Sequence, residues 1–219
     1  MPLRVSALRA LGATDNVFAI ESFIDELAVA AGADPVEFRL RHMKDARARA
    51  VIELAAQQAG WRAGAASDGT SGRGIAFAQY KNGYGYLAVV IEIGLEPDLH
   101  VTRAVAAVDV GQAINPDGII NQTEGGIIQA ISWTLKEQVR FDRARVTTRT
   151  WEDYPILTFP EVPRVEVHLI NRPDEAPLGA GEMAAGPVSA AIANALHHAL
   201  GVRIRDLPLT RERIAAALT

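Results

Sequence analysis

The apolar pattern of the chain changes between residues 63 and 72, and this change limits the folds open to it. Before this segment apolar residues recur at helical spacing; after it, short runs rich in β-branched residues are separated by Gly, Asn, Pro and Asp. The segment itself is small, polar and glycine-rich, which is typical of a linker. We therefore predict an α+β protein, with a helical segment over residues 1–62 and a mainly antiparallel or mixed sheet with packed helices over residues 73–219. One continuous domain across both segments is the alternative.

The N-terminal segment predicts three helices. An amphipathic pattern from Asp15 ends at Gly32. Residues 34–37, Asp-Pro-Val-Glu, supply an N-cap, a proline for the first turn and an acidic residue, so a second helix begins there. A third helix is predicted from about Asp45 to Ala59. Four arginines of these last two helices alternate with acidic residues, which indicates solvated helix surface: Arg39, Arg41, Arg47 and Arg49.

The segment after the linker predicts an antiparallel meander followed by helices and further strands. The turn over residues 81–85 carries a tyrosine, with another on each side of it, and these are candidates to line a pocket or simply to pack at the sheet end. A long helix begins near Asn115-Pro116, another helix covers residues 188–200, and a short one begins at Arg211. The predicted strands cover residues 74–80, 86–93, 101–110, 145–149 and 165–170.

Composition excludes several classes of function. A hydrophobic content of 49% with 22% charged residues indicates a globular chain, and a net charge of −4 without a long basic run argues against nucleic acid as a partner. With no cysteine the chain holds no disulfide or iron–sulfur cluster, and its five histidines form no spaced set that predicts a metal site made of protein ligands. No apolar run reaches the roughly 20 residues that span a bilayer. We expect a soluble chain of unassigned compartment, cytoplasmic, or associated with a membrane or the periplasm through partners.

A glycine-rich loop over residues 176–187 carries one acidic side chain, Glu182, just before the predicted helix at residues 188–200. Glycines let a backbone approach a bulky ligand closely, and the loop contains three: Gly179, Gly181 and Gly186. Glu182 is therefore expected at a helix entrance, on a backbone that can bend around a ligand. A solvated glutamate in a surface loop is the alternative, because carboxylates are mostly exposed.

The long helix contains a glycine pair, Gly125 and Gly126. Each glycine costs about 1 kcal/mol relative to alanine in a helix interior, which suggests close approach by another backbone or a ligand. Gln122 lies one turn before the pair, and Gln129 lies two turns after Gln122 on nearly the same face. Amide side chains suit a heterocycle with alternating donors and acceptors. Polar residues on an exposed helix face are an equally good interpretation.

Six motifs occur in a specific order along nearly the whole chain: SALRALGA (6–13), FAIESFIDELA (18–28), DPVEFR (34–39), DVGQAINP (109–116), QTEGG (122–126) and GAGE (179–182). Together they resemble the C-terminal portion of the molybdopterin-binding large subunit of molybdenum hydroxylases, the xanthine oxidase and aldehyde oxidase family. The similarity is greatest to the bacterial branch that contains isoquinoline and nicotinate oxidoreductases. Any one motif is weak, whereas six in the correct order are specific.

The resemblance implies the α+β fold of the molybdenum cofactor-binding domain and assigns roles to residues. Glu182 matches the glutamate of the Gly-x-Gly-Glu loop. It would be the base that deprotonates a hydroxide bound to molybdenum, which attacks an electron-poor ring or carbonyl carbon while hydride passes to a terminal sulfide. Such a base needs a pKa near the operating pH, and burial beside the metal centre is expected to raise it. Gln122 would hydrogen-bond the pterin, and the other residues expected at the cofactor are Gly125, Gly126, Gly179 and Gly181.

The N-terminal arm carries Arg9, followed by Gly12. An arginine can clamp an anion, although most arginines in terminal arms have no such role. By the resemblance, Arg9 and Gly12 match a segment that passes near the metal and would contact the cofactor. The usual family pattern is Arg-Gly-Phe-Gly, and here Ala10 and Leu11 stand between the two matched residues. This departure puts backbone contacts at Arg9 in question.

The resemblance implies a component of a molybdenum hydroxylase that oxidises a small aldehyde or hydroxylates an N-heterocycle with water as oxygen donor. The expected cofactor is molybdopterin with molybdenum, in the cytosine dinucleotide form used by most bacterial relatives. Because family large subunits are several times longer, the expected partners are a larger molybdopterin-binding chain that shares the cofactor and an iron–sulfur subunit that holds the clusters. The alternatives are a non-catalytic cofactor-binding or assembly module, and an orphan fragment that exposes an apolar interface and aggregates alone. A homo-oligomer is a further possibility for the chain in isolation.

Overall fold

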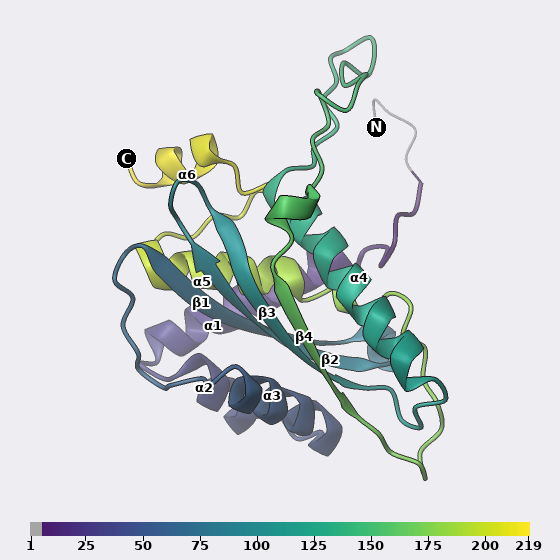
Figure 1. The fold of residues 1–219 in the computed structure, drawn as a ribbon. Coiled ribbons are helices and arrows are strands. Elements are labelled where there is room, and N and C mark those ends of the chain that lie inside the picture. Colours follow the sequence, from purple (N-terminus) through teal and green to yellow (C-terminus); the bar gives the residue numbers. More distant parts are fainter. Residues whose placement is uncertain (1–5) are drawn as a thin grey trace.

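A four-stranded sheet lies at the centre of residues 6–219, the part of the chain described by the computed structural model (Figure 1). The strands follow the order β1-β2-β3-β4, and the first three form the predicted antiparallel meander. Strand β4 pairs with β3 in parallel, so the sheet is mixed. The predicted α+β class is confirmed. The strands are β1 (Ser71–Gln79), β2 (Tyr86–Gly94), β3 (His100–Asp109) and β4 (Arg164–Ile170).

Most helix boundaries agree with the predicted caps. The Asp34 carboxylate accepts hydrogen bonds from the amides of Val36 and Glu37 at 2.9 and 3.2 Å, and Asn115 accepts one from Gly118 at 3.0 Å. These bonds satisfy amides that have no partner in the first turn of a helix. The helices are α1 (Ala13–Ala30), α2 (Pro35–His42), α3 (Ala46–Gln58), α4 (Pro116–Leu135), α5 (Val188–Leu200) and α6 (Arg211–Ala217).

Helices cover both faces of the sheet, which explains why β2 and β3 are apolar on both sides (Figure 1). Helices α2 and α3 lie against one face, where Val51, Ile52 and Ala55 share a core with strand residues including Ile75 and Val90. The helical N-terminal segment thus contributes directly to the core of the sheet. The opposite face is covered by α4 and α5.

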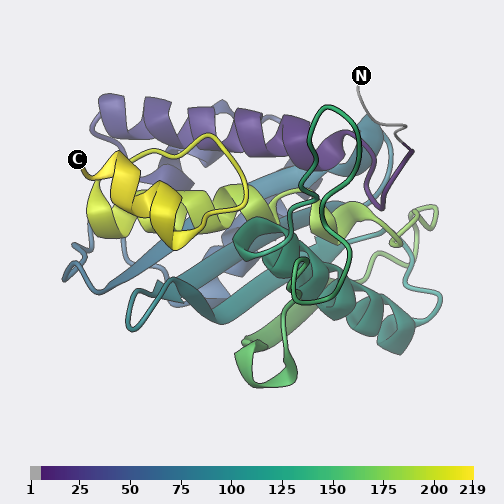
Figure 2. The ribbon, with the colours of Figure 1, turned by 90° about the horizontal axis from the view of Figure 1, so that it is seen from above.

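Helix α5 is buried around most of its circumference. It lies between the sheet and α1, and Figure 2 shows α1 and α5 side by side. The contact with β1 is close: a Cβ atom at Gly74 would lie 2.4 Å from the Ala191 carbonyl oxygen. Small residues on α5 and glycine on β1 therefore allow one helix to be enclosed on several sides.

Two arginines expected at the solvated surface are instead paired with acidic groups of other elements, Arg39 in a buried position and Arg47 in a partly buried one. Arg39 is 3% exposed, and its Nε donates a 2.9 Å hydrogen bond to Glu21, which also accepts the Phe77 amide at 2.9 Å. Arg47 contacts Asp109 through two hydrogen bonds. Because both acidic partners lie on other elements, the alternation of charges along the helix did not reveal them. The prediction of solvated surface was wrong for Arg39 and Arg47.

The predicted strand over residues 145–149 was also wrong. This region belongs to a projecting segment, residues 136–163, whose only strand-like pairing is one bridge between Phe141 and Val146 and which ends in the 3₁₀ turn Phe159–Glu161 (Figures 1 and 2). Val146, the apolar residue of this stretch, is 39% exposed and pairs only with Phe141 across that bridge, and Phe159, later in the segment, is 96% exposed. Among residues 6–219, no helix has the length and apolar character needed to cross a bilayer.

Candidate functional site

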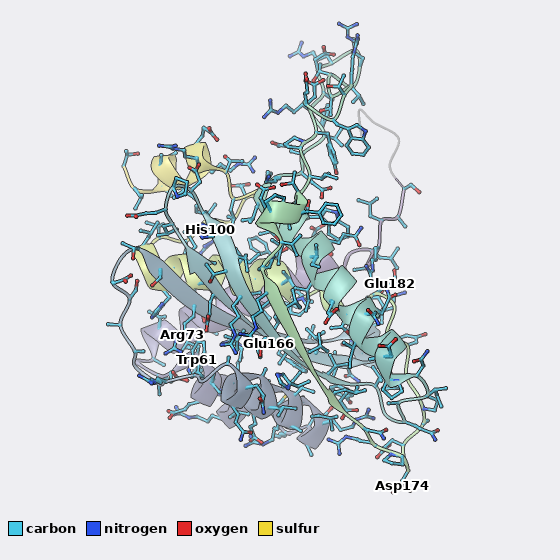
Figure 3. All side chains as sticks on the ribbon, viewed as in Figure 1. Trp61, Arg73, His100, Glu166, Asp174 and Glu182 are labelled. Atoms are coloured by element: carbon cyan, nitrogen blue, oxygen red, sulfur yellow. The ribbon has the colours of Figure 1, made fainter. Side chains whose placement is uncertain are left out.

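Glu182 lies in the loop between β4 and α5, immediately before the 3₁₀ turn Met183–Ala185, and Figure 3 shows it near α4. Its carboxylate accepts one hydrogen bond on each oxygen. The Ala10 amide donates to Oε1 at 3.0 Å, and the Tyr80 hydroxyl donates to Oε2 at 2.7 Å. Three segments distant in sequence therefore converge on this side chain: the N-terminal arm, the end of β1 and the glycine-rich loop.

These contacts determine the ionisation of the pair. The hydrogen bond from Tyr80, then that from Ala10, holds the pKa of Glu182 below its usual range, and the nearby charges of Lys81 and Arg9 act in the same direction against the effect of burial. Burial and the bond to Glu182 raise the pKa of Tyr80 to about 12. Burial itself acts to raise the Glu182 pKa, but within the described chain the hydrogen bonds outweigh it, and the effect of burial beside a metal centre stays a prediction. At neutral pH Glu182 is an ionised proton acceptor and Tyr80 is a protonated donor.

The Gly181 carbonyl oxygen, next to Glu182, accepts three hydrogen bonds. Arg9 donates two of them, from Nε at 3.0 Å and Nη2 at 2.7 Å, and the Gln122 amide donates the third at 2.8 Å. Arg9 also donates to the side-chain oxygen of Gln129 at 2.9 Å. Within the described residues, Arg9 thus binds backbone and amide oxygens and fixes the glycine-rich loop against α4.

Some of the predicted glycines are explained by packing inside the chain. A Cβ at Gly126 would lie 2.8 Å from that of Ala184, so α4 can approach the turn after Glu182 only with glycine there. A Cβ at Gly179 would meet the Tyr84 ring at 3.3 Å. Gly12 has no such constraint, since its nearest atom would be 3.5 Å away. The structure places Gly12 on the arm at the start of α1, outside the hydrogen-bonded cluster.

Two other predicted glycines face open space. A Cβ at Gly125 or at Gly181 would have no atom of the described chain within 4 Å, apart from the excluded nearest backbone neighbours. The side chain of Gln122 donates a hydrogen bond to the Gly181 carbonyl, and Gln122 is itself exposed. Packing within the chain does not explain glycine at either position. A bulky group that approaches the backbone would explain it, so these residues fit a cofactor on this side of the site.

The amide that Ala10 presents to Glu182 depends on an uncommon backbone conformation. Ala10 and Leu11 have φ angles of 71° and 52°, although neither is glycine, and Ala10 is fully buried. Such conformations persist where the surrounding contacts over-determine them, often at functional sites. Sequence reasoning missed the Ala10 amide and singled out Tyr80 only as part of a tyrosine-bearing turn. Their contacts with Glu182 span 172 and 102 residues, so no local pattern contains them.

A buried carboxylate, Asp109, anchors the start of the loop that leads to Glu182. It is 0% exposed and accepts hydrogen bonds from Arg47, from Arg172 and from the Gly111 amide. Burial raises its pKa, but the hydrogen bonds from Arg47 and Arg172 outweigh burial and hold the pKa below its usual value. The Arg172 amide also donates to the Gly111 carbonyl at 3.0 Å. This network therefore fixes the chain just after β4, where the loop begins.

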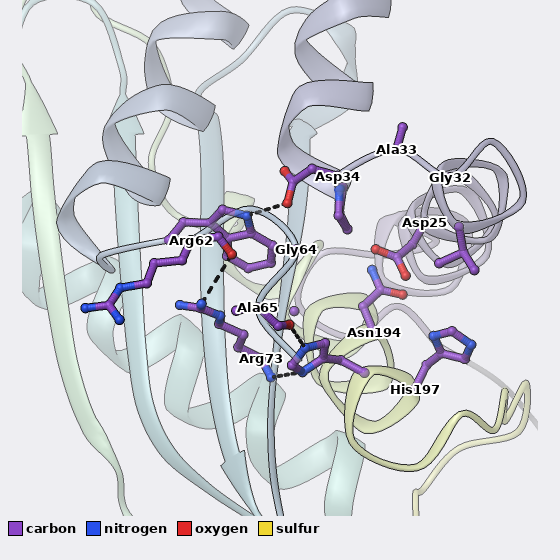
Figure 4. A pocket seen from close by; sticks show the side chains of 15 residues that line it. Asp25, Gly32, Ala33, Asp34, Arg62, Gly64, Ala65, Arg73, Asn194 and His197 are labelled. Carbon is purple, nitrogen blue, oxygen red and sulfur yellow. Dashed lines mark hydrogen bonds between the residues drawn. The ribbon is translucent and has the colours of Figure 1, made fainter. Parts of the chain in front are cut away.

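A cavity of about 370 Å³ lies between α1, α2, β1 and α5, away from Glu182 (Figures 3 and 4). Its polar groups bind one another: Trp61 donates to Asp34 at 2.9 Å, and the Arg73 guanidinium lies 5.1 Å from the Trp61 ring centroid. His198 Nε2 is 2.8 Å from the Ala65 carbonyl oxygen. None of the predicted site residues lines this cavity. Among residues 6–219, no group of three or more His, Asp or Glu side chains is arranged to hold a metal ion.

Comparison with known proteins identifies the family. Residues 13–163 match the family model described as the molybdopterin cofactor-binding domain. Over 99% of its length the chain is 43% identical to one of the subunits of nicotinate dehydrogenase from Pseudomonas putida. Over 94% of its length it is 35% identical to the beta chain of isoquinoline 1-oxidoreductase from Brevundimonas diminuta. The chain spans only 20% and 26% of these two relatives.

Solved structures agree with this assignment. The structure of quinoline 2-oxidoreductase from Pseudomonas putida 86 matches 61% of the chain with a TM-score of 0.55 and 34% sequence identity. The match covers 18% of the quinoline 2-oxidoreductase chain. The aldehyde oxidoreductase from Desulfovibrio gigas shares the fold over 99% of the chain, with a TM-score of 0.79 and 16% sequence identity. The match covers 42% of the aldehyde oxidoreductase chain. The chain therefore belongs to the molybdopterin cofactor-binding domain family of the molybdenum hydroxylases, the xanthine oxidase family.

Proposed function

We propose that the chain supplies one side of the active site of a molybdenum hydroxylase that hydroxylates an N-heterocycle or oxidises an aldehyde with water as oxygen donor. The observation that carries the proposal is the ionised Glu182 carboxylate, held by Tyr80 and Ala10 next to a loop with an open glycine backbone. The chain spans about a fifth to a quarter of its curated relatives. The partners in the proposal are a larger molybdopterin-binding chain and an iron–sulfur subunit.

The cofactor would be held by Gln122, Gly125 and Gly181. The exposed amide of Gln122 can donate and accept hydrogen bonds, and the two glycines leave the backbone accessible to a pterin. When bound, the molybdenum cofactor accepts the two electrons that leave the substrate carbon. Arg9 acts indirectly, because it holds the Gly181 carbonyl and thereby the loop. The cytosine dinucleotide form of the cofactor is part of the proposal by analogy with bacterial relatives.

Glu182 would act as the general base. A carboxylate has about four lone-pair sites, and the bonds from Ala10 and Tyr80 occupy two of them. The remaining sites accept the proton that the water-derived nucleophile loses as it attacks the electron-poor carbon. The lowered pKa leaves the carboxylate ionised at neutral pH and able to accept a proton, whereas a pKa nearer the operating pH would make it a stronger acceptor.

An N-heterocycle is the preferred substrate class of the proposal. Two of the curated relatives described above are named for nicotinate and isoquinoline, and the solved relative with 34% identity is named for quinoline. These are electron-poor aromatic rings, whose carbon atoms beside nitrogen are open to a nucleophile. The aldehyde oxidoreductase relationship, at 16% identity, supports the fold alone.

The experiment that tests the proposal is elemental analysis for molybdenum in the protein purified from its native host, with identification of every chain that co-purifies. We expect molybdenum together with a larger partner chain and an iron–sulfur subunit, and oxidation of N-heterocycles by this complex. Isolation of the chain in its native host without metal or partners would overturn the proposal. Molybdenum in a complex that turns over no heterocycle or aldehyde would favour the non-catalytic cofactor-binding module.

The open face at Gly125 provides a separate prediction. Gly125→Ala should raise the free energy of unfolding of the chain by about 0.5–1 kcal/mol, because alanine is the better helix former and its Cβ meets no neighbour. It should also lower the molybdenum content of the purified complex, because the added methyl group enters the proposed cofactor side. Urea unfolding and elemental analysis measure the two effects.

Gly126→Ala is the matched comparison for Gly125→Ala. Its Cβ would lie 2.8 Å from that of Ala184, so it should destabilise the chain rather than stabilise it. If Gly125→Ala retains full molybdenum content, Gly125 does not contact the cofactor.

A further inference from the structure

The turn between β1 and β2 presents a hydroxyl group to the proposed base. Tyr80 is the first residue of the 3₁₀ turn Tyr80–Asn82, is 7% exposed and donates a 2.7 Å hydrogen bond to Glu182 Oε2. We propose that Tyr80 is a positioning residue that orients the Glu182 carboxylate and keeps it in its proton-accepting form. The proposal rests on the function proposed for Glu182 and adds a residue that acts through it.

Backbone hydrogen bonds close the turn that carries the phenol. The Tyr80 amide donates to the Gly85 carbonyl at 3.0 Å, and the Tyr84 amide donates to the Tyr80 carbonyl at 3.0 Å. Between them, Lys81 and Asn82 have φ angles of 49° and 53°, a conformation that non-glycine residues rarely adopt. The backbone around Tyr80 is thus closed by hydrogen bonds on both sides of a tight turn.

The same turn interlocks with the loop that carries Glu182. A Cβ at Gly85 would lie 2.4 Å from the sulfur of Met183, the residue after Glu182. On the other side, the Tyr84 ring would be 3.3 Å from a Cβ at Gly179. Each element therefore approaches the other at a glycine. This close packing fixes the distance between the Tyr80 hydroxyl and the Glu182 carboxylate.

The hydrogen bond has a predictable electrostatic effect. A donor on a carboxylate oxygen stabilises the ionised form more than the protonated form, so loss of the Tyr80 hydroxyl leaves Glu182 easier to protonate. Arg9 and Lys81 are the charged groups that act on Glu182, and both remain in a Tyr80→Phe variant. The change therefore isolates the phenol from the other influences on the carboxylate.

The test compares two tyrosines of one turn in the complete complex. Tyr80→Phe should move the acid limb of the profile of kcat/KM against pH to higher pH, with a loss of about tenfold on the acid side and a smaller loss at alkaline pH, the scale of a hydrogen bond to a charged group. Tyr84→Phe keeps the ring that packs over Gly179 and should leave the acid limb in place. A purely structural role for Tyr80 predicts an equal loss at all pH values, which would overturn the proposal.

A second measurement needs no turnover. In the 219-residue chain labelled with ¹³C at the glutamate carboxyl carbons, the resonance missing in Glu182→Gln identifies Glu182. Its NMR titration should move to higher pH in Tyr80→Phe and should not move in Tyr84→Phe. An unchanged titration in Tyr80→Phe would disprove the positioning role even if Glu182 is the base. A shifted titration together with normal turnover in Glu182→Gln would instead remove Glu182 from the mechanism and leave the contact intact.

Discussion

Replacement of Glu182 by glutamine is expected to lower turnover of the complete complex by at least about a hundredfold, the scale on which a general base contributes. Glutamine has nearly the same shape, and its side-chain oxygen can still accept the hydrogen bond from Tyr80 or Ala10. The loop should therefore remain in place while the proton acceptor is lost. The measurement is steady-state turnover alongside the molybdenum content of the same preparation, which should stay at the wild-type level.

Asp174→Asn is the matched control for Glu182→Gln. Asp174 lies in the same loop between β4 and α5, is exposed, and Figure 3 shows it far from Glu182. The control removes one negative charge from the loop without changing the cluster around Glu182, so turnover should be unchanged. Near-normal turnover in Glu182→Gln would exclude Glu182 as the base, whereas a loss of molybdenum would assign the residue to cofactor retention.

Asp109→Asn is expected to lower the free energy of unfolding by about 3 kcal/mol, the lower end of the cost of removing one partner from a buried ion pair. The variant keeps the side-chain volume but leaves the guanidinium groups of Arg47 and Arg172 without the carboxylate that neutralises them. The lower end applies because the two arginine side chains are 19% and 31% exposed, so solvent screens part of the cost. Urea unfolding of the chain measures the effect.

Asp98→Asn is the control for an exposed pair. Asp98 and Arg211 are 3.3 Å apart with side chains 59% and 79% exposed, and loss of such a pair should cost less than about 1 kcal/mol. Similar losses of unfolding free energy in Asp98→Asn and Asp109→Asn would show that burial does not strengthen the contribution of Asp109 to stability.

The same carboxylate predicts a pH dependence. The folded-state pKa of Asp109 is lowered, so its contribution to stability is present above the unfolded pKa of about 4 and is lost as pH falls through the folded pKa. The stability difference between wild type and Asp109→Asn should therefore narrow in acid. A difference that stays constant from neutral pH to about pH 3 would contradict an ionised Asp109.

Local patterns in the sequence were sufficient for the elements that depend on local forces. Asp34 and Asn115 are capping residues followed by proline, and both start a helix in the structure because their side chains satisfy amides only two or three residues away. The meander β1-β2-β3 followed from β-branched runs and short turns, since antiparallel neighbours need little connecting chain. The order of the six motifs likewise predicted the family, because it is a property of the sequence itself.

The hydrogen-bond partners of the candidate site residues were decided by the tertiary fold. Sequence patterns singled out Glu182, Gln122 and Arg9. They did not reveal that Arg9 binds Gly181 or that Tyr80 binds Glu182, because these contacts join residues more than 100 positions apart. The resemblance assigned these residues a relation to the cofactor, and their roles there stay a prediction.

Burial likewise depended on contacts between distant elements. Arg39 and Arg47 had the pattern of a solvated face, yet acidic groups from other elements pair with them inside the protein. Residues 145–149 had the composition of a strand, but a strand also needs a neighbour to satisfy its backbone, and the projecting segment offers only one bridge. Local sequence was enough to place the helices and the meander strands, because caps and periodicity act over a few residues. Which polar groups meet was set by the folded chain, because the free energy of a buried charge or backbone group depends on the partner that the fold brings to it.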